Sequence, residues 1–196
     1  MKAFKSALIE IAYILGGALI IFLLFQLTLQ NSIVDGTSMD PNLKNADRLL
    51  VSKVSYVFSE PKRGDIVIFP SPYGDGREFI KRIIGLPGDT VQIVSGAVQI
   101  NGTTLDEPYL VNRDSRNYPK TVIPPGEYFV LGDNRPVSLD SRQGWTIKRA
   151  DIKGKAWLVF WPFKSFGLAP NHKFANIAAG ALLAPLLIMR REENSH

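Results

Sequence analysis

The chain has 196 residues, and hydrophobic types make up 45% of them, which suits an apolar segment joined to one globular domain. It contains no cysteine, and this excludes a disulfide framework, a thiolate metal site and thiol catalysis. The formal net charge of +5 favours contact with anionic lipid headgroups. Nucleic acid is not an expected partner, because the sequence has no run of lysine and arginine with interleaved aromatic residues.

The first predicted element is an apolar run from Ala7 to Leu29. As a helix it would be about 34 Å long, enough to cross a hydrocarbon core of roughly 30 Å. Lys2 and Lys5 precede it and predict that residues 1–6 are cytoplasmic. A cleavable signal peptide is the alternative, but it would have a shorter apolar region and a small-x-small site, which residues 26–31 do not offer. We therefore predict an uncleaved transmembrane anchor followed by an exported domain.

Residues 30–173 are expected to form that domain, because short β-rich runs alternate with turn residues along them. The predicted strands are residues 48–54, 65–69, 78–84, 90–94, 97–100, 128–131 and 156–161. Ser95-Gly96 is predicted to be a two-residue hairpin turn. Frequent strands without a convincing amphipathic helix between them predict a mainly β fold, an antiparallel sheet or barrel-like domain. The polar stretch 105–125 is expected to be a small insert or long loop.

A second apolar run covers residues 174–189 and would be about 24 Å long as a helix, which is short for a membrane span. Pro185 interrupts it, yet Arg190 and Arg191 behind it fit a return to the cytoplasmic side. We predict a second transmembrane helix here, with an interfacial helix as the alternative, and a basic, polar tail over residues 190–196.

A serine suited to nucleophilic attack, Ser38, lies close behind the first apolar run. The alternative is that this stretch is only a polar turn leaving the helix. A Ser-His-Asp arrangement would need His172 or His196, and both are poorly placed near the end of the chain. A lysine can replace the histidine as general base if its ammonium group is desolvated in an apolar setting.

Lys81 differs from the other lysines because it lies among bulky apolar residues of the predicted strand 78–84. Strand alternation puts Lys81 on one face with Phe79 and Ile83, and puts Arg82 on the other face. One of these two cations must therefore share a face with apolar neighbours. The alternative is a surface lysine on an edge strand.

A polar loop over residues 132–142 follows a predicted strand and holds hydroxyl groups, acids and arginines close together. A solvated turn is the default interpretation. Such a set of side chains can also hydrogen bond a buried amine and tie loops together through an Asp–Arg pair.

Four segments, in this order, resemble motifs of the type I signal peptidases of peptidase family S26. These are membrane-bound Ser–Lys endopeptidases that release exported proteins from their signal peptides. The segments are GTSMDPNL (36–43), KRGDIVIF (62–69), FIKRIIGLPGD (79–89) and GDNRPVSLDSR (132–142). Their joint occurrence behind an anchor is very specific. The resemblance implies a serine endopeptidase with the signal peptidase fold, and we expect no cofactor and no metal.

The resemblance implies, residue by residue, that Ser38 is the nucleophile, Lys81 the general base and Ser138 the hydroxyl that orients the lysine amine. The backbone N–H of Ser38 would be an oxyanion donor. Some family members add a side-chain hydroxyl two positions before the nucleophile, where this chain has Gly36. The implied supporting residues are Asp133, Asn134, Asp140 and Arg142. The residues expected to shape the substrate cleft are Met39, Pro41, Phe79 and Ile80.

The implied substrates are preprotein signal peptides, bound as an added strand and cut after small-x-small sites. Membrane lipid and the secretion machinery are expected partners, with the catalytic domain on the extracytoplasmic side of a bacterial plasma membrane. Trp157, Trp161, Phe163 and Phe166 either pack in the core or contact the membrane interface. Two further functions stay open: a specialised peptidase that matures one pilin or conjugation substrate, and an inactive membrane-tethered module that binds peptides.

Overall fold

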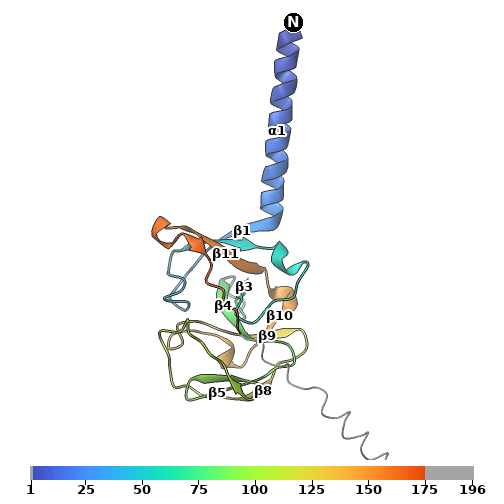
Figure 1. Cartoon of the computed structure of the whole chain (residues 1–196). Coiled ribbons are helices and arrows are strands. Elements are labelled where there is room, and N and C mark those ends of the chain that lie inside the picture. The colour runs from blue at the N-terminus through green and yellow to red at the C-terminus, as the bar shows by residue number, and fades with distance from the viewer. Residues whose placement is uncertain (1, 175–196) are drawn as a thin grey trace, which may run out of the picture.

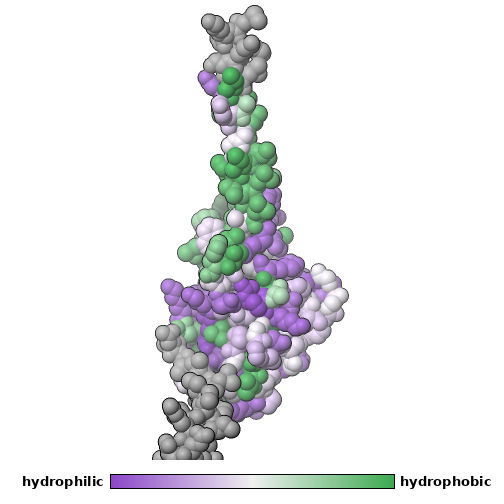
Figure 2. Space-filling model, turned by 90° about the vertical axis from the view of Figure 1, so that its right-hand side faces the viewer, coloured by the Kyte–Doolittle hydropathy of each residue, from purple (hydrophilic) through white to green (hydrophobic). Residues whose placement is uncertain are grey.

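The computed structural model describes residues 2–174, and its first element is a long helix, α1 (Lys2–Thr28). Figure 1 shows this helix standing away from a β-rich domain. Its segment Ile9–Thr28 has a hydropathy of 2.2, and no part of it is buried against the protein. At 1.5 Å per residue the segment is about 30 Å long, which matches a hydrocarbon core. Its hydrophobic surface stands out in Figure 2. The predicted second apolar helix lies outside the described residues, apart from Phe174.

The foot of α1 passes into a strand, β1 (Leu29–Ile33), with no linker between them. This strand pairs with β2 (Arg48–Ser52), with Leu29 opposite Ser52. Lys53 closes the end of the helix, because its Nζ donates to Gln26 O at 2.7 Å and its N–H to Thr28 O at 2.9 Å. These bonds satisfy carbonyls that a helix end leaves free. No strand was predicted over residues 29–33, because their central residues are polar and do not show the apolar pattern of a strand.

The larger sheet is antiparallel at every pairing and has eight strands within the described residues. Its order is β1, β2, β11 (Gly154–Trp161), β3 (Ile66–Pro70), β4 (Glu78–Gly85), β9 (Glu127–Leu131) and β10 (Ile147–Lys148), with β12 (Gly167–Leu168) on β11. Short 3-10 helices connect some of these strands: η1 (Val54–Tyr56), η2 (Ser141–Gln143), η3 (Arg149–Asp151) and η4 (Phe163–Ser165). The predicted mainly β, antiparallel fold is confirmed.

The smaller sheet has the order β7 (Thr103–Thr104), β6 (Ala97–Ile100), β5 (Thr90–Val94) and β8 (Tyr118–Val122). Ser95 and Gly96 join β5 to β6 with positive φ angles of 48° and 81°, so the predicted two-residue hairpin turn is confirmed. Strand β8 lies inside the polar stretch 105–125, for which only a loop or insert was predicted. It forms because β5 offers it a free edge.

Strand β4 lies between three hydrophobic clusters and contributes to each of them. Ile80 belongs to the cluster that includes apolar residues of β2, β3 and β11, and Ile83 to the one that includes Phe69 and Val130. Ile84 belongs to the third cluster, with the apolar side chains of the smaller sheet. A polar side chain in the middle of β4 is therefore surrounded by packed apolar atoms, which raises the free-energy cost of any charge there.

Candidate active site

The loop between β1 and β2 carries Ser38 and is held down by buried apolar residues. Val34, Met39 and Leu43 pack into the first hydrophobic cluster. Gly36 has a φ of +94°, a value that favours glycine, and the space around its Cα is open. These anchors hold Ser38, which is only partly buried, at the top of the cluster.

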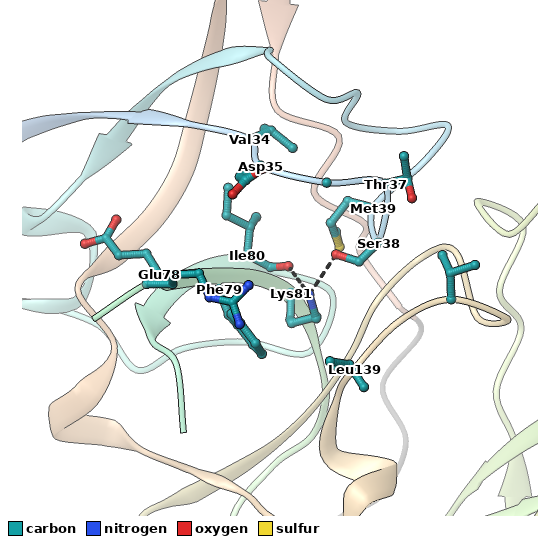
Figure 3. A pocket seen from close by; sticks show the side chains of 13 residues that line it. Val34, Asp35, Thr37, Ser38, Met39, Glu78, Phe79, Ile80, Lys81 and Leu139 are labelled. Carbon is teal, nitrogen blue, oxygen red and sulfur yellow. Dashed lines mark hydrogen bonds between the residues drawn. The ribbon is translucent and has the colours of Figure 1, made fainter. Parts of the chain in front are cut away.

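Lys81 lies on β4 opposite Val67 of β3, and only 4% of its surface is exposed. Its Nζ is hydrogen bonded to Ser38 Oγ at 2.8 Å and donates to Ile80 O at 3.0 Å, as Figure 3 shows. Serine and lysine from segments 43 residues apart thus meet at hydrogen-bonding distance. An amine at this distance from a hydroxyl can accept its proton once the amine is neutral.

The pKa of Lys81 is lowered from 10.5 to about 8, and burial in the apolar interior is the main cause. The negative charges of Asp140 and Asp133 act in the opposite direction and raise it. The ring of Phe79, 5.0 Å from Nζ, also favours the charged form. Burial outweighs these attractions, so about half of the amine is neutral near pH 8 and most of it is neutral at higher pH.

The loop after β9 lies directly behind the serine. The Asn134 N–H donates to Ser38 O at 2.9 Å, and its Nδ2 donates to Thr37 O at 3.0 Å. Gly132 makes this close approach possible. A Cβ on Gly132 would come within 2.2 Å of Ser138 Oγ and 2.5 Å of Ser38 O. The requirement for glycine at position 132 was not predicted from the sequence.

Asp140 and Arg142 form an ion pair that closes this loop. Arg142 Nε donates to Asp140 Oδ1 at 2.7 Å, and Nη2 donates to Oδ2 at 2.8 Å. Asp140 also accepts from the Gly132 N–H at 3.1 Å. Arg142 Nη1 reaches Asp114 Oδ2 at 2.8 Å, which ties the loop to the chain before β8.

Arg82, the residue after Lys81, is completely buried and pairs with Asp133 through two parallel hydrogen bonds. The Nε–Oδ1 distance is 2.8 Å, and the Nη2–Oδ2 distance is 2.6 Å. The guanidinium lies 4.1 Å from the ring centre of Tyr109. Asn42 Nδ2 donates to Asp133 Oδ2 at 2.9 Å, so this pair is linked to the serine loop. The sequence analysis singled out Arg82 and Asp133 separately, but it did not predict that they pair with each other.

A second buried ion pair, Arg135–Glu107, was missed from the sequence. Arg135 Nη1 lies 3.3 Å from Glu107 Oε2, and Arg135 Nε donates to Gly132 O at 3.0 Å. Glu107 belongs to the polar stretch 105–125, where its partner could not be foreseen. This stretch therefore supports the loop behind Ser38.

Ser138 lies in the same loop with its Oγ buried. Within residues 2–174 this oxygen has no hydrogen-bond partner, so the hydrogen bond expected between Ser138 and Lys81 is not formed in this structure. The oxygen faces Gly132, close to Ser38 O. A buried hydroxyl without a partner carries a free-energy cost of about 1–3 kcal/mol.

A pocket of about 200 Å³ opens beside the serine and lysine. Of the predicted substrate-binding residues, Met39, Phe79 and Ile80 line it, while Pro41 does not. Figure 3 shows the chain before Ser38 on one side of the pocket and the chain before Lys81 on another. Pro41, two residues after Met39, is not among the residues that line this pocket, so its role in the substrate cleft stays a prediction.

One edge of β4 changes character along the strand. Residues 78–82 of β4 pair with β3 on one edge of the strand. On the other edge, pairing with β9 begins only at Arg82. Within the described residues, no strand pairs with the other edge of residues 78–81, which line the pocket instead. An extended peptide therefore has free backbone groups to pair with at this place.

His172 does not lie at this pocket. Its ring packs 5.3 Å from Tyr109 and 4.6 Å from Phe174. Within residues 2–174, no three histidine or acidic side chains converge as metal ligands would.

Comparison with known proteins places this geometry in a family. The family model for signal peptidase, peptidase S26, matches residues 8–161. A probable signal peptidase I-2 of Synechocystis sp. is 41% identical over 140 residues, which are 69% of this chain and 64% of the relative. A signal peptidase I of Bacillus licheniformis is 43% identical over 144 residues, which are 67% of this chain and 76% of the relative.

A signal peptidase I of Enterococcus faecalis V583 of known structure is 38% identical; the match covers 50% of this chain and 97% of that one, with a TM-score of 0.43. The family match spans most of the described chain, including most of α1 and both residues of the Ser38–Lys81 contact. The resemblance noted in the four motifs is thereby confirmed: the chain belongs to the signal peptidase family, peptidase S26, a family of membrane-associated serine endopeptidases.

Proposed function

We propose that this chain cleaves the signal peptides of exported preproteins with Ser38 as nucleophile and Lys81 as general base. The observation that carries the proposal is the 2.8 Å contact between Lys81 Nζ and Ser38 Oγ, made by a lysine that is almost fully buried. The lowered pKa of Lys81, about 8, supplies a neutral amine in the range where a general base is useful.

The reaction follows from these two side chains. Neutral Lys81 takes the proton of Ser38 Oγ while the oxygen attacks the scissile carbonyl carbon, and the ammonium then returns a proton to the leaving amine. The signal peptide stays bound to Ser38 as an ester. Lys81 next takes a proton from a water molecule, which attacks the ester. The ammonium returns this proton to Ser38 Oγ as the ester bond breaks, which releases the second product with a new carboxyl group and restores both side chains.

The negative charge on the attacked oxygen needs hydrogen-bond donors. We assign the backbone N–H of Ser38 to this role, because no hydrogen bond within residues 2–174 uses it. Gly36 offers no side-chain donor, and the open space beside it admits a water molecule or a substrate group instead. The second donor is therefore expected near Gly36.

The loop over residues 132–142 is proposed to position the two reacting groups. Asn134 holds the backbone of the serine loop from behind, and the Asp140–Arg142 pair closes the loop itself. Asp133 stays paired with Arg82 and contributes its charge at a distance. The unpartnered Ser138 Oγ is expected to bind the lysine amine during the reaction, which would explain why a buried hydroxyl is kept there.

The substrate is proposed to lie as an added strand along residues 78–81, with its main chain paired to the free edge of β4. The pocket to which Met39, Phe79 and Ile80 contribute apolar side chains has a volume of about 200 Å³, which is small beside the roughly 300–1,000 Å³ of ordinary ligand pockets. Small side chains fit such a space, in keeping with cleavage after small-x-small sites.

The apolar helix also supports this function. Helix α1 runs directly into β1, so a bilayer around α1 would hold the site a short way from its surface. Trp157, Trp161, Phe163 and Phe166 are exposed, and the orange segment that runs from β11 into the following turn lies at the α1 end of the domain in Figure 1. We propose that they contact the lipid interface on the extracytoplasmic side. Contact with the secretion machinery is a further expectation of this placement.

The test is cleavage of a preprotein by the full chain in detergent. Ser38→Ala and Lys81→Met should each abolish cleavage while the circular dichroism spectrum stays unchanged. Lys120→Ala, which removes an exposed lysine far from the pocket, is the matched control and should cleave normally. Cleavage at the normal rate by either site variant would refute the Ser–Lys assignment.

A further inference from the structure

The loop behind the serine shows an inverted pattern of exposure. Val137 and Leu139 are 57% and 51% exposed, whereas Ser138 and Asp140 between and beside them are 2% and 0% exposed. A loop in water usually turns its polar side chains outward and its apolar ones inward. Here the side chains of Ser138 and Asp140 point into the protein, and those of Val137 and Leu139 point into solvent.

Both exposed side chains line the pocket that holds Ser38 and Lys81. In Figure 3, Leu139 lies beyond Lys81, on the opposite side of the lysine from Glu78. The apolar surface is therefore continuous with the reaction site and is not an isolated patch. Covering it with an apolar group removes its contact with water, which is favourable.

The two side chains are also held in place before any ligand binds. The Ser138 N–H donates to Asn134 O at 3.1 Å, and Asp140 is fixed by Arg142 and the Gly132 N–H. A binding surface on a fixed loop loses little conformational entropy when it is covered. The hydrogen bonds of the loop thus hold Val137 and Leu139 in their exposed positions.

The position of this surface identifies which part of a substrate covers it. The free edge over residues 78–81 suits the main chain of the half that stays bound as an ester, because that half must be retained until water attacks. Val137 and Leu139 come from the loop whose Asn134 N–H bonds to Ser38 O, and in Figure 3 Leu139 lies across Lys81 from Glu78. That side faces the half that leaves.

We propose that Val137 and Leu139 form a subsite for an apolar side chain of one of the first two residues after the cleaved bond. The inference rests on the proposed function, because it takes Ser38 as the point of attack. These two residues determine specificity and take no part in the chemistry. Substrates whose released chain begins with apolar residues are cleaved faster than those that begin with polar ones.

The test uses synthetic peptides that share one small-x-small site and differ only in the two residues after the cut, which are Leu-Leu or Asn-Asn. With the full chain in detergent, kcat/KM for the Leu-Leu peptide should be about tenfold higher, as expected when an apolar side chain is buried. In the Val137→Asn/Leu139→Asn variant this ratio should fall to about one. Val122→Asn, an exposed valine of β8 outside the pocket, is the matched control and should keep the ratio.

Equal rates for the two peptides with the wild-type chain would overturn the proposal, and so would an unchanged ratio in the double variant. If the double variant instead alters the preference for residues before the cut, the surface binds the other half of the substrate, and the assignment is wrong. The ratio is measured on an active enzyme. A failure here therefore leaves the Ser–Lys assignment intact, whereas cleavage by Ser38→Ala would refute that assignment alone.

Discussion

The two halves of strand β4 each contain a buried cation, but they differ in how their edges are paired and in what the cation contacts. Residues 78–81 pair with β3 only and leave their other edge to the pocket, while residues from Arg82 onward are paired on both edges. A buried cation lies on each side of the boundary between the two parts: Lys81 ends the first part, and Arg82 begins the second. Lys81 has a hydroxyl and a carbonyl as hydrogen-bond partners, and Arg82 has a carboxylate.

This difference in partners decides what each cation can do. An ammonium group that is buried without a carboxylate in contact loses its proton more easily, because the charged form is poorly solvated. A guanidinium in a bidentate pair keeps its charge and joins two segments. Adjacent residues thus become a reactive base and a structural clamp, because their side chains leave the strand on opposite faces.

The largest effect is expected when the reactive cation is made to resemble its neighbour. Lys81→Arg places a group beside Ser38 that stays protonated in proteins, so it cannot accept the serine proton. The rate of preprotein cleavage should fall by about a thousandfold or more, in the range of general-base catalysis. Activity within tenfold of wild type would show that the charge state of residue 81 is irrelevant.

A large loss of stability, and not of chemistry alone, is expected when the clamp is removed. Arg82→Met leaves Asp133 buried with an unpaired charge and should lower the free energy of unfolding by about 3–5 kcal/mol. Chemical denaturation measures this loss. Adding Asp133→Asn should recover part of it, because the orphan charge disappears. An Arg82→Met chain as stable as wild type would show that the pair contributes nothing.

The most gradual effect in this series concerns pH. Because the pKa of Lys81 is lowered to about 8, the amine is mostly neutral above that pH and mostly protonated below it. The cleavage rate should therefore fall as the pH decreases through about 8, by about tenfold for each further pH unit. Asp140→Asn removes a negative charge that raises the pKa of Lys81. The midpoint of the pH–rate curve of this variant should therefore lie at lower pH than that of the wild type. A rate that is constant from pH 9 to pH 5 would exclude Lys81 as the base.

Local patterns in the sequence were enough for most elements of the fold. The strands predicted at 65–69, 78–84 and 90–94 agree within one residue with the strands found, because apolar and β-branched residues bounded by glycine and proline define them. The apolar run predicted as a helix over residues 7–29 is found within the helix Lys2–Thr28, except for Leu29, which begins β1. Lys81 stood out for the same local reason, since its neighbours on the strand are bulky and apolar.

Long-range partners could not be predicted in this way. Strands β1 and β8 have polar sequences and exist because a neighbouring strand pairs with them. The partner of Arg82 lies 51 residues away and that of Arg135 lies 28 residues away. Nothing near these residues in the chain encodes such a pairing.

The sequence by itself determined an apolar anchor, a β-rich domain and four motifs that identify the family, because these properties are carried by neighbouring residues. Only the tertiary structure decided that Ser38 and Lys81 are in contact, that Ser138 is buried without a partner and that Pro41 lies outside the pocket. Only the packing of β4 between three apolar clusters buries Lys81. Burial lowers the pKa of the lysine, and it arises from residues that are distant in the chain and adjacent in space.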